Sequence, residues 1–140
     1  MGKSVAVVYW SGTGNTESMA SAVAEGVSEA GGEATVVSVS DFSEDDVASY
    51  DAIAFGCPAM GDEDLEDSEF RPVWDACKDV LGDTPVVLFG SYAWGVGDWM
   101  DNWKEEAADA GVNVVDTVTS YEDPDDEAVE ACKAAGKALA

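Results

Sequence analysis

The stretch Ser11-Gly12-Thr13-Gly14-Asn15-Thr16 decides how the chain folds, because it separates a run of apolar residues from a long amphipathic segment. The preceding run, residues 5–10, is almost continuously apolar, which is typical of a central parallel strand covered on both faces. The following segment, residues 16–30, repeats apolar side chains at helical spacing and ends at two glycines. The stretch is therefore predicted to be a tight turn from a strand to a helix.

Such a turn is chemically suited to a phosphate. The start of a helix offers backbone N–H groups and the positive end of the helix dipole. Gly12 and Gly14 permit close approach of the backbone, and the side chains of Ser11, Thr13 and Asn15 can add hydrogen bonds. The turn alone supports equally a phosphate monoester site and a strand-to-helix turn with good capping chemistry.

The rest of the chain alternates between strand and helix patterns. Further strands are predicted at residues 34–39, 52–56, 86–90 and 112–118, and further helices at residues 70–81 and 98–110. A capped turn is expected at Ser43 to Asp46, and Asp123-Pro124 is expected to start a last helix. This pattern predicts a single α/β domain over residues 1–140, a three-layer doubly wound fold. Its five-stranded parallel sheet has the order 2-1-3-4-5, with helices on both faces.

Composition limits the kind of protein. No apolar run among the 140 residues approaches the length of a membrane span, and the N-terminus does not resemble a secretion signal. We therefore expect a soluble, cytoplasmic protein without membrane contact. The three scattered cysteines argue against a disulfide framework, and the absence of histidine excludes histidine-dependent triads and the usual zinc sites. No metal site is expected.

The charge is extreme, at −24 from 30 acidic and six basic residues. Nucleic-acid binding is excluded on this ground, because phosphate backbones require cations. The acidity could steer a basic protein partner or keep the surface solvated in a salt-rich environment. Long-range steering would be screened at molar salt, where the Debye length is about 3 Å. The wide spread of carboxylates favours the halophile-like interpretation.

Three loops are predicted at the carboxyl edge of the sheet, where doubly wound folds bind their ligands. A P-loop is excluded because the first loop has no lysine, and Glu17 stands where a dinucleotide motif has its third glycine. The sequences VYWSGTGNTE at residues 8–17, GCPAMGDE at 56–63 and SYAWGVGDW at 91–99 resemble the three cofactor loops of short-chain flavodoxins. The resemblance covers the whole chain.

This resemblance implies one noncovalently bound FMN and no metal. It also implies a low-potential one-electron carrier that is not an enzyme and that cycles between oxidised, neutral semiquinone and hydroquinone flavin. Partners would be redox enzymes that donate or accept electrons during transient docking, and the protein would be a monomer. The alternative is a small FMN-dependent NAD(P)H or quinone reductase on the same fold.

The resemblance also assigns roles to residues. Ser11, Thr13, Asn15 and Thr16 would hold the phosphate with Ser91 as a further contact, while Trp94 and Met60 would cover the two faces of the flavin ring. The Gly61 carbonyl would accept a hydrogen bond from the protonated flavin N5, and Glu63 would accept one from N3–H. Ala93, Val96 and Pro58 depart from common family residues. The full predicted set is Trp10, Ser11, Gly12, Thr13, Gly14, Asn15, Thr16, Pro58, Ala59, Met60, Gly61, Asp62, Glu63, Ser91, Tyr92, Ala93, Trp94 and Gly95.

Overall fold

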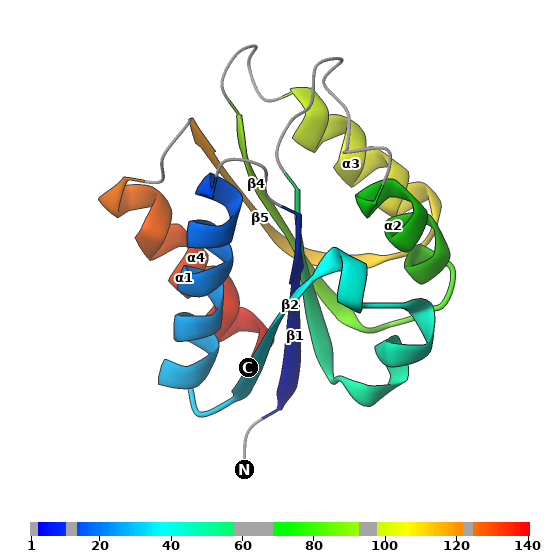
Figure 1. Cartoon of the computed structure of the whole chain (residues 1–140), viewed down its shortest axis with the longest axis horizontal. Helices are drawn as coiled ribbons and strands as arrows, with labels where there is room; N and C mark the ends of the chain where they lie inside the picture. The colour runs from blue at the N-terminus through cyan, green and yellow to red at the C-terminus, as the bar shows by residue number, and fades with distance from the viewer. Residues whose placement is uncertain (1–2, 11–13, 58–68, 93–97, 122–124) are drawn as a thin grey trace.

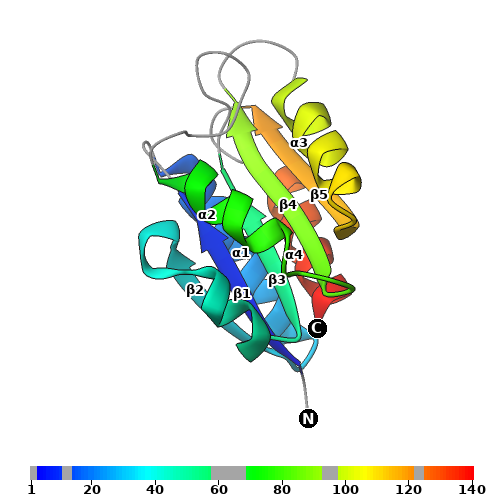
Figure 2. The ribbon, with the colours of Figure 1, turned by 90° about the vertical axis from the view of Figure 1, so that its right-hand side faces the viewer.

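The structure, a computed structural model, describes residues 3–10, 14–57, 69–92, 98–121 and 125–140. Five parallel strands form one sheet in the order β2-β1-β3-β4-β5, as predicted, and the order can be followed across Figure 2. The strands are β1 (Ser4–Tyr9), β2 (Glu33–Ser38), β3 (Ala52–Gly56), β4 (Pro85–Tyr92) and β5 (Asn113–Tyr121).

Helices cover both faces of the sheet and give the predicted three layers. In Figure 1 α1 (Asn15–Glu29) and α4 (Asp126–Leu139) lie on one side of the strands, and α2 (Phe70–Lys78) and α3 (Asp98–Asp109) lie on the other. The short 3₁₀ helices η1 (Val39–Asp41) and η2 (Glu44–Ser49) connect β2 to β3. The expected capped turn is confirmed, because Ser43 and Asp46 form a reciprocal capping box at the start of η2.

Alternate residues of the central strand β1 enter two separate cores. Val5 and Val7 pack on the α1 and α4 side, whereas Ala6 and Val8 pack on the α2 and α3 side. All four side chains are fully buried. Burying one valine side chain contributes about 1.5 kcal/mol or more to folding, so this strand needs apolar residues at every position.

Aromatic side chains fill much of the core between the sheet and helices α2 and α3. The helical spacing of Trp74, Trp99 and Trp103 predicts that they are core residues, and each is at most 1% exposed. The rings of Phe55 and Trp74 lie 5.3 Å apart and nearly perpendicular, an arrangement that aromatic quadrupoles favour. The rings of Trp74 and Trp103 lie 5.7 Å apart at 88°, so the two helices meet through aromatic edges and faces.

Two strands are longer than their sequence patterns indicate. The predicted fourth strand stops at residue 90, but β4 continues to Tyr92, and β5 continues to Tyr121 beyond the predicted residue 118. The two strands pair throughout this extension, with Ser91 opposite Ser120 and Tyr92 opposite Tyr121. Ser91 and Tyr92 therefore belong to a strand and not to the predicted loop, because hydrogen bonding between the strands persists where the apolar pattern ends.

Two helix ends also differ from prediction. Helix α2 ends at Lys78 and not at residue 81, because the N–H of Val80 donates to the carbonyl of Cys77 (2.9 Å), three residues back instead of four. The predicted N-cap of the last helix, Asp123, is wrong. Asp125 caps α4 and accepts a hydrogen bond from the N–H of Ala128 at 2.8 Å.

Other sequence predictions concern cysteines, metals and membranes. The three cysteines are free and buried, the usual position of a cysteine that serves as a small apolar side chain. Across the described ranges, no group of three or more acidic or cysteine side chains is arranged to hold a metal ion. No α-helix within those ranges combines the length and apolar character needed to cross a bilayer.

Candidate functional site

The three strands that precede the predicted loops end side by side. The N–H of Trp10, just after β1, donates to the carbonyl of Gly56 at 3.0 Å. The N–H of Cys57, just after β3, donates to the carbonyl of Phe89 in β4 at 3.0 Å. Sheet hydrogen bonding therefore brings residues 10, 57 and 92 to one edge of the sheet, as the parallel topology predicts.

Helix α1 begins at this edge from a glycine. Gly14 is the N-cap residue and has a φ of 92°, a left-handed conformation that L side chains disfavour. Its carbonyl accepts hydrogen bonds from the N–H and the hydroxyl of Ser18 at 3.0 and 3.1 Å. A glycine cap carries no side-chain acceptor for the first-turn N–H groups, so a phosphate oxygen is a chemically suitable acceptor there.

A buried hydrogen bond joins the first turn of α1 to the end of β4. The hydroxyl oxygens of Thr16 and Ser91 lie 3.2 Å apart, and the two residues are 1% and 4% exposed. Since a hydroxyl can donate one hydrogen bond while it accepts others, this pair can also bond to a ligand at the edge. The pairing could not be read from the sequence, although both residues were predicted site residues.

A further buried hydroxyl lies in the neighbouring strand β5, next to this edge and outside the Thr16–Ser91 hydrogen bond. Ser120 in β5 is 6% exposed and lies opposite Ser91 in the register of the sheet. Sequence reasoning missed Ser120, because residue 120 lay beyond the predicted end of its strand. The hydrogen bond of this edge joins Thr16 to Ser91, and Ser120 is their neighbour only through the register of the sheet.

On the other face of the sheet, the ends of β3 and β4 are fixed to helix α3. The indole N–H of Trp99 donates to the carbonyl of Cys57 at 3.2 Å, and the rings of Trp99 and Tyr92 lie 5.5 Å apart. A Cβ at Gly90 would lie 2.1 Å from the carbonyl oxygen of Cys57, so only glycine permits this approach. Trp99 was predicted as a core residue, and its hydrogen bond to the site edge was missed.

Tyr9 and Glu17 flank the first loop. The phenol of Tyr9 donates to Oε2 of Glu17 at 3.5 Å. Partial burial, together with the charge and hydrogen bonding of Glu17, raises the pKa of Tyr9 above its usual value. The phenol is therefore a protonated donor at neutral pH, and the Glu17 carboxylate is held by it.

The chemistry of the edge fits a phosphate ester. Residues 10–16 and 91–97 contain hydroxyl and amide side chains but no lysine or arginine. Backbone dipoles and neutral donors can hold a phosphate without a formal counter-charge. The described members of the predicted set are Trp10, Gly14, Asn15, Thr16, Ser91 and Tyr92, and all of them lie at this edge.

The remaining predicted site residues lie outside the described residues. They are Ser11, Gly12, Thr13, Pro58, Ala59, Met60, Gly61, Asp62, Glu63, Ala93, Trp94 and Gly95. Their roles stay predictions. The described chain fixes only where their segments begin and end: after Trp10 and before Gly14, after Cys57 and before Glu69, and after Tyr92 and before α3.

Comparison with known proteins identifies the family. The flavodoxin family model matches residues 7–136. The chain is 47% identical to the flavodoxin of Megasphaera elsdenii over 97% of this chain and 98% of that protein. It is 42% identical to the flavodoxin of Clostridium beijerinckii over 96% of this chain and 97% of that protein. The solution structure of two-electron reduced Megasphaera elsdenii flavodoxin superposes with a TM-score of 0.90 at 47% identity, covering 96% of this chain and 97% of that one. The chain therefore belongs to the flavodoxin family and is an FMN-binding electron carrier.

Proposed function

We propose that FMN binds across the carboxyl edge of the sheet with its phosphate at the start of α1. The Thr16–Ser91 hydrogen bond carries this proposal, because it places two buried hydroxyls beside a helix N-terminus that begins from Gly14. Backbone N–H groups, the Asn15 amide and the hydroxyls of Ser11 and Thr13 would complete the phosphate site.

The ring of the flavin would lie toward residues 57–63 and 92–95. FMN supplies the redox chemistry, accepting and releasing electrons one at a time. Trp94 and Met60 would cover its two faces and exclude water, as flat aromatic and polarizable thioether groups can do. The Gly61 carbonyl would accept a hydrogen bond from protonated N5, and Glu63 would accept one from N3–H. Asp62 and Glu63 would place negative charge near the ring and so disfavour the addition of further negative charge.

The carrier would exchange electrons with redox enzymes through transient docking, as a cytoplasmic monomer that binds neither nucleic acid nor membranes. The net charge of −24 supports the exclusion of nucleic acid, since no excess of cations is available for phosphates. The acidic surface would keep the protein hydrated in concentrated salt.

A stepwise reductive titration of the purified protein, followed by visible absorption, tests the proposed function. The expected protein is yellow, holds one FMN and takes up two electrons in two separate steps. It should oxidise NAD(P)H only when a partner reductase is added. A colourless protein that fails to take up FMN would refute the proposed site. Rapid steady-state NAD(P)H oxidation without a partner would favour the reductase alternative.

A further inference from the structure

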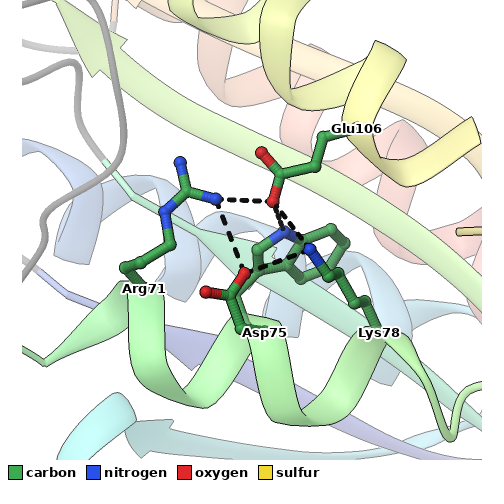
Figure 3. A network of polar contacts seen from close by, with 5 residues as sticks. Arg71, Asp75, Lys78 and Glu106 are labelled. Carbon is green, nitrogen blue, oxygen red and sulfur yellow. Dashed lines mark hydrogen bonds and ion pairs between the residues drawn. The ribbon is translucent and has the colours of Figure 1, made fainter. Parts of the chain in front are cut away.

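Helices α2 and α3 are joined by ionic and polar contacts that converge on one carboxylate oxygen. Oε1 of Glu106 in α3 accepts hydrogen bonds from three side chains of α2. These are Nη1 of Arg71, Nε1 of Trp74 at 2.9 Å and Nζ of Lys78 at 3.3 Å. Asp75 lies beside the same cations, 3.2 Å from Nζ of Lys78 and 3.6 Å from Nη1 of Arg71. Figure 3 shows Arg71 and Lys78 reaching toward Glu106 from the helix below it.

These contacts use scarce side chains. The chain has one arginine and five lysines among 140 residues, and Arg71 and Lys78 both pair with Glu106. In such an acidic protein a solvated helix face would need no cations. The other interhelical ion pairs among the described residues join Lys133 and Lys137 of α4 to α1.

The Glu106 contacts are also sheltered. The side chains of Arg71, Lys78 and Glu106 are 23%, 23% and 28% exposed, and the Trp74 indole beneath them is fully buried. Burial acts to raise the pKa of Glu106, but hydrogen bonds from Arg71 and Trp74, with the Arg71 charge, bring that pKa below its usual value. The carboxylate is therefore ionised at neutral pH, and salt screens its contacts less than it screens exposed pairs.

Aromatic packing beneath the carboxylate joins the same two helices. The ring of Trp103 lies 5.7 Å from that of Trp74 and 5.4 Å from that of Phe70, close to perpendicular in both cases. Removal of the Glu106 charge would leave this apolar contact in place. The directional polar contacts therefore orient one helix on the other, while the aromatic contacts between the helices do not depend on the Glu106 charge.

The two joined helices begin where the two proposed ring-binding segments end. Helix α2 starts at Phe70, just after residues 57–69, and helix α3 starts at residue 98, just after residues 92–97. Trp99 in the first turn of α3 also holds the Cys57 carbonyl at the start of the other segment. A change in the orientation of α2 on α3 would therefore displace the ends of both segments relative to each other.

We infer that Glu106 is a positioning residue for the flavin ring, acting through the α2–α3 joint on the segments at residues 57–69 and 92–97. The inference rests on the proposed function, which places the ring between these segments. Ordering loops in advance lowers the free-energy cost of binding, so loosening the joint weakens ring binding even when the fold persists.

The test compares Glu106→Gln with Glu105→Gln, its neighbour on α3. Both substitutions remove one negative charge, but Glu105 is exposed and outside the Glu106 contacts. Apo-protein is titrated with FMN and with riboflavin, which lacks the phosphate, and urea denaturation is measured alongside to find conditions where each variant is folded. Glu106→Gln should weaken the binding of both flavins by about tenfold and leave the ratio of the two affinities unchanged. Glu105→Gln should leave both affinities unchanged.

Three results would overturn the inference. In the first, Glu106→Gln lowers the urea midpoint but leaves both flavin affinities unchanged. In the second, Glu106→Gln and Glu105→Gln change the flavin affinities equally. In the third, Glu106→Gln weakens the binding of FMN but not that of riboflavin. If Glu106→Gln does not fold, Lys78→Gln takes its place, because it removes the longest of the three hydrogen bonds. It should weaken the binding of FMN and of riboflavin equally, by about two- to threefold. Failure of the wild-type protein to bind FMN would refute the proposed function itself, which is a separate outcome.

Discussion

The hydroxyl oxygens of Thr16 and Ser91 lie 3.2 Å apart and almost completely buried, although 75 positions separate the two residues in the chain. The bond ties the first turn of α1 to the last residues of β4. A shift of either element would leave a buried hydroxyl unpaired, which costs about 1–3 kcal/mol. The two described hydroxyls of the proposed phosphate site are therefore joined by a contact that exists without the flavin.

Replacing Gly14 with alanine should destabilise the fold without a steric clash. A Cβ at this position meets nothing within 4 Å, so the cost comes from the φ of 92° alone. We expect a loss of about 1–2 kcal/mol in the free energy of unfolding, measured by urea denaturation of the apo-protein. Gly14→Asn is the matched control and should lose less, because asparagine tolerates left-handed backbone. Equal losses for the two variants would contradict this explanation.

Replacing Trp94 with alanine should remove the proposed stacking surface of the flavin ring. Stacking on an aromatic side chain contributes about 1–3 kcal/mol, so FMN should bind about tenfold or more weakly. Flavin fluorescence, which we expect Trp94 to quench in the wild type, should be largely restored in the variant. Trp94→Phe keeps an aromatic face and should retain most of the affinity. If Trp94→Ala leaves both affinity and fluorescence unchanged, another residue stacks on the ring.

The buried thiols predict a loss of stability at high pH. Burial, followed by the charges of Glu44 and Asp46 for Cys77 and of Asp116 for Cys132, raises both pKa values from 9.0 to about 12. Above pH 9 the unfolded chain releases thiol protons that the folded chain retains. The free energy of unfolding should therefore fall between pH 9 and 12, by up to about 1.4 kcal/mol per pH unit for each thiol.

The measurement is the urea midpoint at pH 8.0 and pH 10.5, compared with that of a Cys77→Ala and Cys132→Ala double variant. The urea midpoint of the double variant should change less with pH across this interval. Neither thiol should react with a disulfide reagent at pH 8 until the protein unfolds. An identical pH dependence for the double variant would show that these thiols do not contribute.

The acidic surface predicts a stability that rises with salt. With a net charge of −24, carboxylate repulsion in the compact state is strongest when the Debye length is long. The urea midpoint of the apo-protein should increase from about 0.1 M to about 2 M KCl. The urea midpoint of a variant with asparagine at the exposed positions Asp45, Asp83 and Asp109 should change less with salt. A midpoint that is the same at both concentrations would contradict the halophile-like interpretation.

The sheet could be predicted because its central strands are marked by features of the nearby sequence. The apolar runs of β1 and β3 and the glycines after the helices are short-range features, and the strand order followed from parallel connections. The ends of β4 and β5 could not be predicted, because Ser91 and Ser120 stay in the sheet by pairing with each other's strand and not by propensity.

The site was predicted as three loops that meet at one edge of the sheet, but the contacts that join its parts were not predicted. Thr16 meets Ser91, and Trp99 meets the Cys57 carbonyl, across sequence separations of 75 and 42 residues. Nothing in the residues near Trp99 indicates that its indole is a donor to the site edge, since its helical spacing also suits a core residue. Likewise Glu106 follows another acidic residue, Glu105, and its three partners become visible only in the fold.

Titration of the apo-protein with FMN and riboflavin, for the wild type, Ser91→Ala and Ser120→Ala, tests the proposed phosphate site most directly. The wild type should bind one FMN per chain, and riboflavin at least about tenfold more weakly. Ser91→Ala should weaken the binding of FMN by about fivefold and have little effect on the binding of riboflavin, because one hydrogen bond at the phosphate end is lost. Ser120→Ala, the same change at the opposite register position, should alter neither affinity. Equal affinities of the wild-type protein for FMN and riboflavin would contradict the account.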